Sequence, residues 1–204
     1  MKTKSVRIAA GVGAVTLALV GISAGVSFAD DKPAQNSQNS QSAQSAPAAA
    51  AERFLGGSST VPANLVPPAG NALTSVFKAK GVQIYGCTDA KWALIEPAAT
   101  LVGITLNPVK AASALHFRGP SWQSPDDGSL VEGTSPVTAP SATPNSIPQL
   151  LVTAKLSRGP GVFGDVTFIQ RLDTVGGVAP AAACTAGATA AVPYTAVYRF
   201  FKKS

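Results

Sequence analysis

Apolar and polar side chains alternate along several stretches of the chain. Because successive side chains of a β-strand point to opposite faces of the sheet, a period of two predicts a strand. The pattern predicts strands at residues 150–156 and 162–172, joined through Arg158-Gly159-Pro160-Gly161, and a last strand at about 191–202. One face of that last strand is apolar and aromatic: Val192, Tyr194, Ala196, Tyr198 and Phe200.

Two turn sequences predict hairpins. Residues 81–87 alternate, and residues 92–95 begin another strand after the polar turn at 88–91. The sequence Pro125-Asp126-Asp127-Gly128 favours a turn that pairs residues 129–133 with 121–123. Each hairpin brings neighbouring strands together without a long connection, which is typical of an antiparallel sheet.

Helical patterning is weak, and only residues 70–80 are compatible with a helix. A run of prolines, namely Pro136, Pro140, Pro144 and Pro148, predicts a surface loop because proline cannot donate to a sheet ladder. Many short strands with Pro and Gly turns predict an all-β domain, built as a single sandwich or barrel.

The first residues have the pattern of a secretion signal. Lys2, Lys4 and Arg7 precede an uncharged stretch that ends in Ser27-Phe28-Ala29, where small side chains suit cleavage by signal peptidase. We therefore expect residues 1–29 to be removed on export. An uncleaved membrane anchor is the alternative, but the stretch is rich in Gly and Ala and ends in a good cleavage site.

Residues 30–51 are rich in Gln, Ser, Asn and Ala and lack branched and aromatic side chains, so they predict a disordered spacer. A helix over 48–53 would be marginal on its own. The remaining residues, 52–204, have the size of one β domain. We expect a protein that is secreted, extracellular or associated with the cell wall, with no stable membrane anchor after cleavage.

Charge and cysteine content narrow the possible functions. The chain carries 16 basic and 10 acidic residues; removing the three basic residues of the signal leaves 13 against 10, or +3. Because the basic residues are scattered, nucleic-acid binding is not expected. Cys87 and Cys184 are the only cysteines, and an even number in an exported chain favours a disulfide over two buried thiols.

Residues 159–164 (Gly-Pro-Gly-Val-Phe-Gly) match the dinucleotide-binding motif G-x-G-x-x-G. In that fold the glycines follow a strand and open a helix, whose first N–H groups hold the pyrophosphate. Here residues 165–172 alternate and contain β-branched and aromatic side chains, so they predict a strand after a glycine-rich turn. We therefore expect neither NAD-dependent dehydrogenase activity nor a cofactor.

His116 is the only histidine, on the opposite face of its predicted strand from Leu115 and Phe117. It could act as a general acid or base with Asp126 or Asp127, but no G-x-S-x-G elbow, free cysteine or H-E-x-x-H motif accompanies it. A hydrogen-bonded structural or surface role is more common for a lone histidine. One histidine without free cysteines also predicts no metal site.

Aromatic side chains could form the core or a stacking platform for sugars and phenolic ligands. Four of them have the regular spacing of core positions: Tyr85, Trp92, Tyr194 and Tyr198. Trp122 follows Gly119-Pro120-Ser121 and suits either role. Arg171 shares a strand face with Ile169, where its charge either pairs with Asp165 or Asp173 or lines a polar pocket; the structural ion pair is favoured.

Four segments together resemble a known family: 81–87 (GVQIYGC), 116–122 (HFRGPSW), 168–177 (FIQRLDTVGG) and 192–198 (VPYTAVY). They are similar to a family of secreted bacterial and fungal proteins catalogued as a domain of unknown function, and the likeness covers about residues 61–201. Some fungal relatives carry a malate-dehydrogenase label, which these residues do not support. The resemblance implies one domain and a Cys87–Cys184 pair, but it transfers no catalytic residues.

If that family has a common site, we expect it where the loop bearing His116, Trp122 and Asp127 meets Arg171. The function expected from the sequence is an extracellular or wall-associated binding module for a small molecule or a cell-wall glycan. The alternative is an extracellular hydrolase or lyase that uses His116 with Asp126 or Asp127.

Overall fold

The computed structural model describes residues 46–56 and 60–204. The predicted signal peptide at 1–29, its cleavage site and the spacer up to residue 45 lie outside the described residues. Two short helical segments precede eight strands: α1 (Ala46–Leu55), η1 (Ala63–Leu65), β1 (Asn71–Thr88), β2 (Lys91–Leu106), β3 (Val109–Phe117), β4 (Ser121–Gln123), β5 (Leu130–Ala139), β6 (Gln149–Arg158), β7 (Val166–Gly176) and β8 (Thr189–Lys203). Neither helical segment of this part of the chain is long and apolar enough to cross a membrane.

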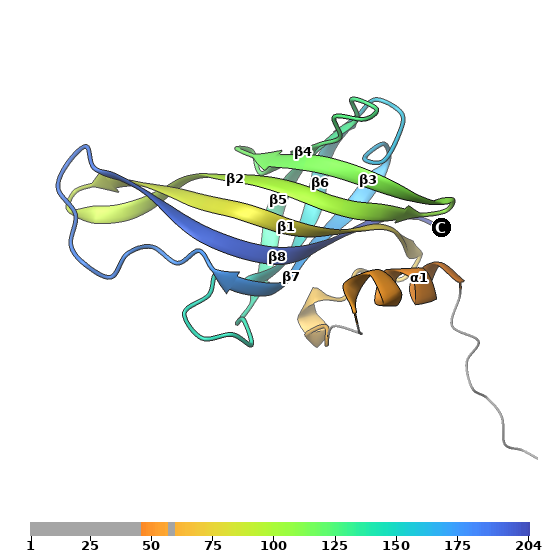
Figure 1. Ribbon diagram of the computed structural model, residues 1–204, viewed down its shortest axis with the longest axis horizontal. Coiled ribbons are helices and arrows are strands. Elements are labelled where there is room, and N and C mark those ends of the chain that lie inside the picture. Colours follow the sequence, from red (N-terminus) through yellow and green to blue (C-terminus); the bar gives the residue numbers. More distant parts are fainter. Residues whose placement is uncertain (1–45, 57–59) are drawn as a thin grey trace, which may run out of the picture. The chain divides into compact units, whose positions relative to one another are not determined.

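The eight strands form one antiparallel sheet that closes into a barrel (Figure 1). Each strand pairs with the next along the chain, and β8 pairs back with β1 from Asn71 opposite Lys203 to Gly86 opposite Thr189. The all-β prediction is therefore confirmed, and the architecture is the barrel rather than the sandwich. Closure removes most of the free sheet edge that an open sheet of this size would expose.

The interior of the barrel is filled by side chains from alternate positions of the strands. Aromatic rings dominate it: Phe77, Trp122, Phe163, Tyr198 and Phe200 are all at most 1% exposed. Their rings contact one another, with centroids 5.6 Å apart for Phe77 and Phe200 and 4.7 Å apart for Phe163 and Phe200. An eight-stranded barrel is just wide enough for its interior to be filled by side chains in this way.

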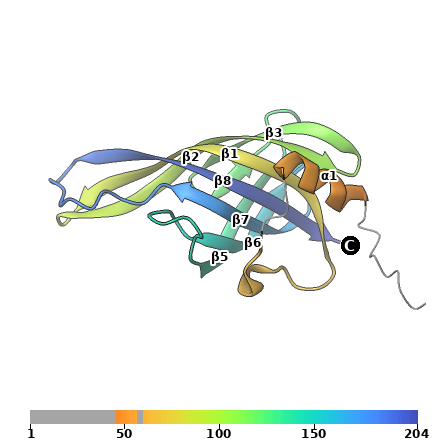
Figure 2. The same cartoon turned by 60° about the horizontal axis from the view of Figure 1, so that its bottom comes forward.

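The N-terminal segments cover parts of the outer surface of the barrel (Figure 2). Ala51 of α1 packs on Val76 of β1 and Leu106 of β2. Leu65 of η1 packs on Leu172 of β7, and its carbonyl accepts a hydrogen bond of 2.6 Å from Gln170 Nε2. Helix α1 includes residue 51, which the sequence analysis predicted as the last residue of the disordered spacer.

Two local predictions are wrong. Residues 71–80 belong to β1 rather than to a helix, and the reason is that Val76 is buried under α1 while Phe77 is buried in the barrel. Burial on both faces removes the polar positions that mark a strand. Pro136 lies within β5 rather than in the loop, at a register shift between Thr134 and Val137 where no regular ladder continues.

The predicted hairpins are confirmed. The first turn joins β1 to β2 with Thr88 opposite Lys91, and the second joins β4 to β5 with Gln123 opposite Leu130. The glycine-rich segment 159–164 is a turn followed directly by β7, as predicted, so no helix opens after it. Strand β7 runs from Val166 to Gly176, whereas the sequence predicted a strand over 162–172.

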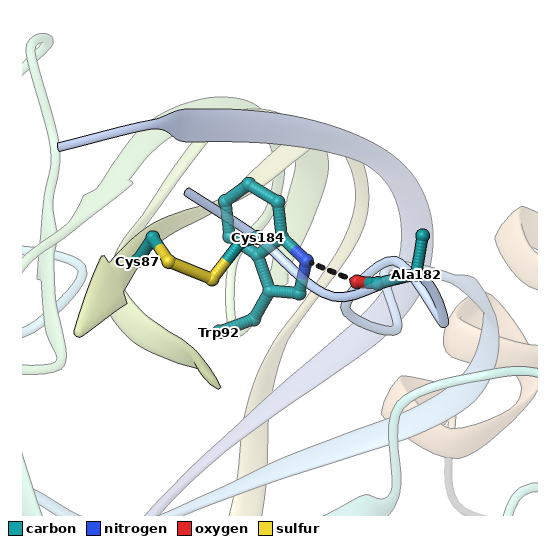
Figure 3. The surroundings of a disulfide bond; sticks show 4 residues. All are labelled: Cys87, Trp92, Ala182 and Cys184. Carbon is teal, nitrogen blue, oxygen red and sulfur yellow. Dashed lines mark hydrogen bonds between the residues drawn. A yellow bond between two sulfur atoms is a disulfide. The ribbon is translucent and has the colours of Figure 1, made fainter. Parts of the chain in front are cut away.

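The disulfide between Cys87 and Cys184 is present, with the two Cα atoms 5.8 Å apart (Figure 3). It ties the tip of β1 to the segment that leads into β8. Trp92 lies directly opposite Cys87 on β2, and its indole N–H donates to the carbonyl of Ala182 at 3.0 Å. The indole and the disulfide therefore hold the same segment by two independent links.

Strand β4 has only three residues, which leaves part of its neighbour without a partner. Its residues pair with positions 115–117 of β3, so no strand of residues 46–56 and 60–204 lies beside the first part of β3 on that side. Asp126 covers this edge, because one carboxylate oxygen accepts both the backbone N–H of Ser113 at 3.1 Å and its hydroxyl at 3.0 Å.

Candidate binding cavity

Three of the side chains expected at a common site line one small cavity. His116, Trp122 and Arg171 meet there with Tyr198, and the apolar side chains of Pro120, Leu150, Val152 and Ile169 complete the wall. The cavity has a volume of about 30 Å³, which is room for about two water molecules. His116, Trp122 and Tyr198 are buried whereas Arg171 is half-buried, so the arginine is on the solvent side.

The turn between β3 and β4 brings His116 and Trp122 together. The two residues are direct cross-strand neighbours, and their rings stack with centroids 4.5 Å apart and planes inclined by 3°. Gly119 in this turn has a φ of 147°, and a Cβ atom there would lie 2.1 Å from the Ser121 hydroxyl. Only glycine therefore permits the path that places the imidazole over the indole.

His116 is held in its neutral form. Burial lowers its pKa to about 4 and the charge of Arg171 acts in the same direction, although the hydrogen bond to the Ser121 carbonyl acts against them. Nδ1 lies 2.8 Å from that carbonyl oxygen. Because a carbonyl only accepts, Nδ1 carries the proton and Nε2 is left as an acceptor.

This lowered pKa makes the stability of the barrel depend on pH. Between pH 6.5 and about 4 the unfolded chain binds a proton at His116 that the folded chain does not, so stability is lost as the pH falls. We expect the free energy of unfolding to drop by about 2–3 kcal/mol between pH 7 and pH 4.5 from this residue. Urea unfolding at both pH values measures it.

The variant His116→Asn is the matched control for that pH dependence. Asparagine retains an N–H donor for the Ser121 carbonyl but does not titrate, so the drop should shrink by about the same 2–3 kcal/mol. Carboxylates titrate equally in both proteins and cancel in the comparison. The interpretation of His116 as a buried neutral base is contradicted if the two proteins lose the same stability.

Arg171 reaches the cavity from the inner face of β7. Its Nε and Nη2 atoms donate to the carbonyl of Pro148 at 3.2 and 2.9 Å. This partner is a backbone carbonyl, which the sequence did not predict. A guanidinium has five N–H donors, and this contact uses two of them.

The charge of Arg171 also acts on two tyrosines next to the cavity. Burial raises the pKa of Tyr85 and of Tyr194, and in each case the arginine charge opposes the rise. The Tyr85 hydroxyl donates to the Gly177 carbonyl at 2.7 Å, and the Tyr194 and Tyr198 hydroxyls lie 3.4 Å apart. The core positions predicted for Tyr85, Tyr194 and Tyr198 are confirmed, whereas Trp92 is only half-buried and lies outside the core.

Trp122 carries an unused hydrogen-bond donor. The indole is 1% exposed, and its Nε1 has no hydrogen-bond partner among residues 46–56 and 60–204. A buried polar group without a partner costs about 1–3 kcal/mol. The wall of the cavity thus includes a residue whose N–H could be satisfied by a bound group.

Asp127 does not join the other three site candidates. Partial burial alone would raise its pKa, but hydrogen bonds from Ser129 and from the Val162 backbone lower it below the usual value. Its oxygens accept from the Ser129 hydroxyl at 2.6 Å and from the Val162 N–H at 2.9 Å. A Cβ atom on Gly161 would lie 2.3 Å from Asp127 Oδ2, which explains a glycine of the G-x-G-x-x-G segment without any phosphate.

Asp126 and Asp127 instead line a surface groove of about 500 Å³ with Lys110 and Ser113. The cavity that holds His116 has neither aspartate in its wall. The pairing of His116 with a carboxylate, on which the hydrolase hypothesis depends, therefore has no support in the geometry. In the part of the chain that the structure describes, no three His, Cys, Asp or Glu side chains cluster as metal ligands would.

Comparison with known proteins identifies a family for this chain, but the description of that family names no activity. A family described as "Protein of unknown function (DUF3455)" matches residues 68–202, which include β1 to β7 and all of β8 except Lys203. No curated protein and no solved structure matches the chain.

Proposed function

Because the chain belongs to the DUF3455 family, whose description names no activity, we propose a function from the site itself: an extracellular or wall-associated binding module. The observation that carries this proposal is the meeting of His116, Trp122 and Arg171 at one cavity. Unsatisfied or partly used polar groups around a small apolar pocket are typical of sites that fix a ligand in one orientation.

The chemistry of the cavity favours an acidic, oxygen-bearing group. The Trp122 N–H and the free N–H groups of Arg171 are donors, and the arginine adds a positive charge. The volume of about 30 Å³ admits only the end of a ligand. The ligand is therefore a molecule with a terminal carboxylate, either a small organic acid or a substituent of a cell-wall glycan, whose remainder stays outside the cavity.

Export is part of the proposal. The Cys87–Cys184 disulfide supports it, since disulfides persist mainly in oxidising compartments outside the cytoplasm. The signal-like residues 1–29 support it from the sequence. The ligand of such a protein is found outside the cell, which is why the wall glycans belong among the candidates.

Binding is favoured over hydrolysis by the state of His116. A general base works best with a pKa near the operating pH and a group that orients it. The pKa of His116 is about 4, and Nδ1 is bonded to a backbone carbonyl rather than to a carboxylate. These properties do not suit a general base that works near neutral pH.

The fluorescence of Trp122 tests the proposal. In a Trp92→Phe background Trp122 is the only remaining tryptophan, so titration with small carboxylates and with soluble wall-glycan fragments should shift its emission for at least one of them. Arg171→Gln should weaken that binding tenfold or more, since a charge-assisted hydrogen bond contributes about 1.5–3 kcal/mol.

Arg118→Gln is the matched control, because it removes the same charge from an exposed side chain that pairs with Glu96 on the surface. Its affinity should stay within twofold of the parent protein. The proposal fails if no member of either panel changes the emission of Trp122, or if Arg171→Gln and Arg118→Gln bind equally well.

A further inference from the structure

Strands β6 and β7 separate at one end of the barrel and leave a cleft between them. Their pairing runs only from Leu150 opposite Arg171 to Thr153 opposite Phe168, although β6 continues to Arg158. A cleft of about 530 Å³ opens beyond the last pair, between β6, the start of β7 and the end of β8. It is separate from the cavity that contains His116.

The cleft is positively charged. Lys155 of β6 and Lys202 and Lys203 of β8 line it together with one acidic residue, Asp165, which leaves a net charge of +2 (three minus one). Within residues 46–56 and 60–204 the ion pairs are formed by arginines, and none joins one of these lysines to a carboxylate. Lys155 and Lys203 are exposed, whereas Lys202 is half-buried and donates to the Gly161 carbonyl at 3.0 Å.

The width of the cleft excludes an added β-strand. The hydroxyl of Ser157 on β6 donates to the carbonyl of Val166 on β7 at 3.3 Å, so one short side chain spans the gap between the two backbones. Neighbouring strands lie about 4.8 Å apart, and a strand inserted between β6 and β7 would need about twice that separation. Recognition here must therefore depend on side-chain charge.

The available donors suit the oxygens of a phosphate group. The hydroxyls of Ser157 and Thr167 are already engaged with backbone carbonyls, which leaves the ammonium groups. Lysine binds phosphate as a compact point charge. Arg158, at the end of β6, is paired with Glu132 at 3.7 Å.

We propose that the lysine cleft formed by Lys155, Lys202 and Lys203 binds a linear phosphate-bearing polymer. A polymer is the fitting partner because the cleft presents cations from two strands, which a chain with repeated negative charges can contact together. Such a contact would hold the barrel at an anionic surface while the cavity at His116 stays free for its own ligand.

Binding of inorganic polyphosphate to the full-length mature protein tests this proposal. Calorimetry at about 50 mM and 150 mM salt should show binding that weakens with salt, because counterions are released from the polymer. Lys155→Gln with Lys203→Gln should weaken binding about tenfold at the lower salt, as expected for two partly screened charge contacts. Lys202 is kept, since it also holds Gly161.

The matched control removes the same charge from another surface, with Lys80→Gln and Lys91→Gln on β1 and β2. Its affinity should stay within twofold of the parent, and both double variants should melt at the parent temperature because all four lysines are exposed.

The proposal is overturned by any of three results: no binding at about 50 mM salt, equal losses in the two double variants, or equal affinity for polyaspartate of the same charge. If orthophosphate displaces polyphosphate at the same concentration of phosphate groups, the cleft does not require a polymer, and that part of the proposal is overturned.

Discussion

Replacing Phe163 with alanine should lower the free energy of unfolding by about 3–5 kcal/mol. Phe163 belongs to the turn between β6 and β7 rather than to a strand, yet its ring is 0% exposed inside the barrel. It contacts Phe77 and Phe200 with centroid distances of 5.9 and 4.7 Å. Truncation would leave a cavity at the end of the core, and the closed sheet around it cannot collapse to fill the space.

Urea unfolding of the purified variant measures this effect, with Phe117→Ala as the matched control. Phe117 is only half-buried at the end of β3, so the same change there removes less buried surface and should cost under about 2 kcal/mol. If Phe163→Ala loses less stability than Phe117→Ala, the turn does not anchor the core in the way that these contacts indicate.

Removing the disulfide with Cys87→Ser and Cys184→Ser should cost about 3–5 kcal/mol. The bond joins residues 97 positions apart, and a long closed loop greatly restricts the unfolded chain. Part of the native geometry should survive, because β1 and β8 remain paired up to Gly86 and Thr189 next to the lost bond. The expected result is therefore a protein that folds to the same barrel with a lower unfolding free energy.

Denaturant unfolding with and without a thiol reductant provides the test. Reductant should destabilise the parent protein to the level of the double serine variant and should leave that variant unchanged. Trp92→Phe is the companion variant: it removes the indole N–H that donates to Ala182 but leaves the covalent link, so it should cost only about 1 kcal/mol. A parent protein indifferent to reductant would mean that the loop is constrained by other contacts.

Local patterning was sufficient to predict the sheet wherever one face of a strand is buried and the other is polar. The tyrosines at 194 and 198 alternate with exposed or half-buried positions, and the cysteines form the expected bond. Prediction failed where both faces are covered. Val76 and Phe77 are neighbours and both are fully buried. The alternation of apolar and polar side chains therefore disappears where α1 packs on the barrel, and no local sequence pattern reveals that contact.

The candidate site was predicted in part for a related reason. His116, Trp122 and Arg171 were chosen by residue type and strand face, and barrel closure brings them to one cavity. Asp127 was chosen for its nearness in sequence to His116, but its partners are Ser129 and Val162, the second of which lies 35 positions away. The partner of Arg171, a backbone carbonyl, leaves no signal in the sequence because every residue has one.

The short fourth strand has a consequence for how this protein behaves at high concentration. A sheet edge with free amides is a template on which a second chain can add, and it invites aggregation. The carboxylate of Asp126 accepts the amide N–H of Ser113, two residues before the first position that pairs with β4, and it places a negative charge where an incoming backbone would have to dock. One side chain thus blocks an edge amide on which a second chain could add.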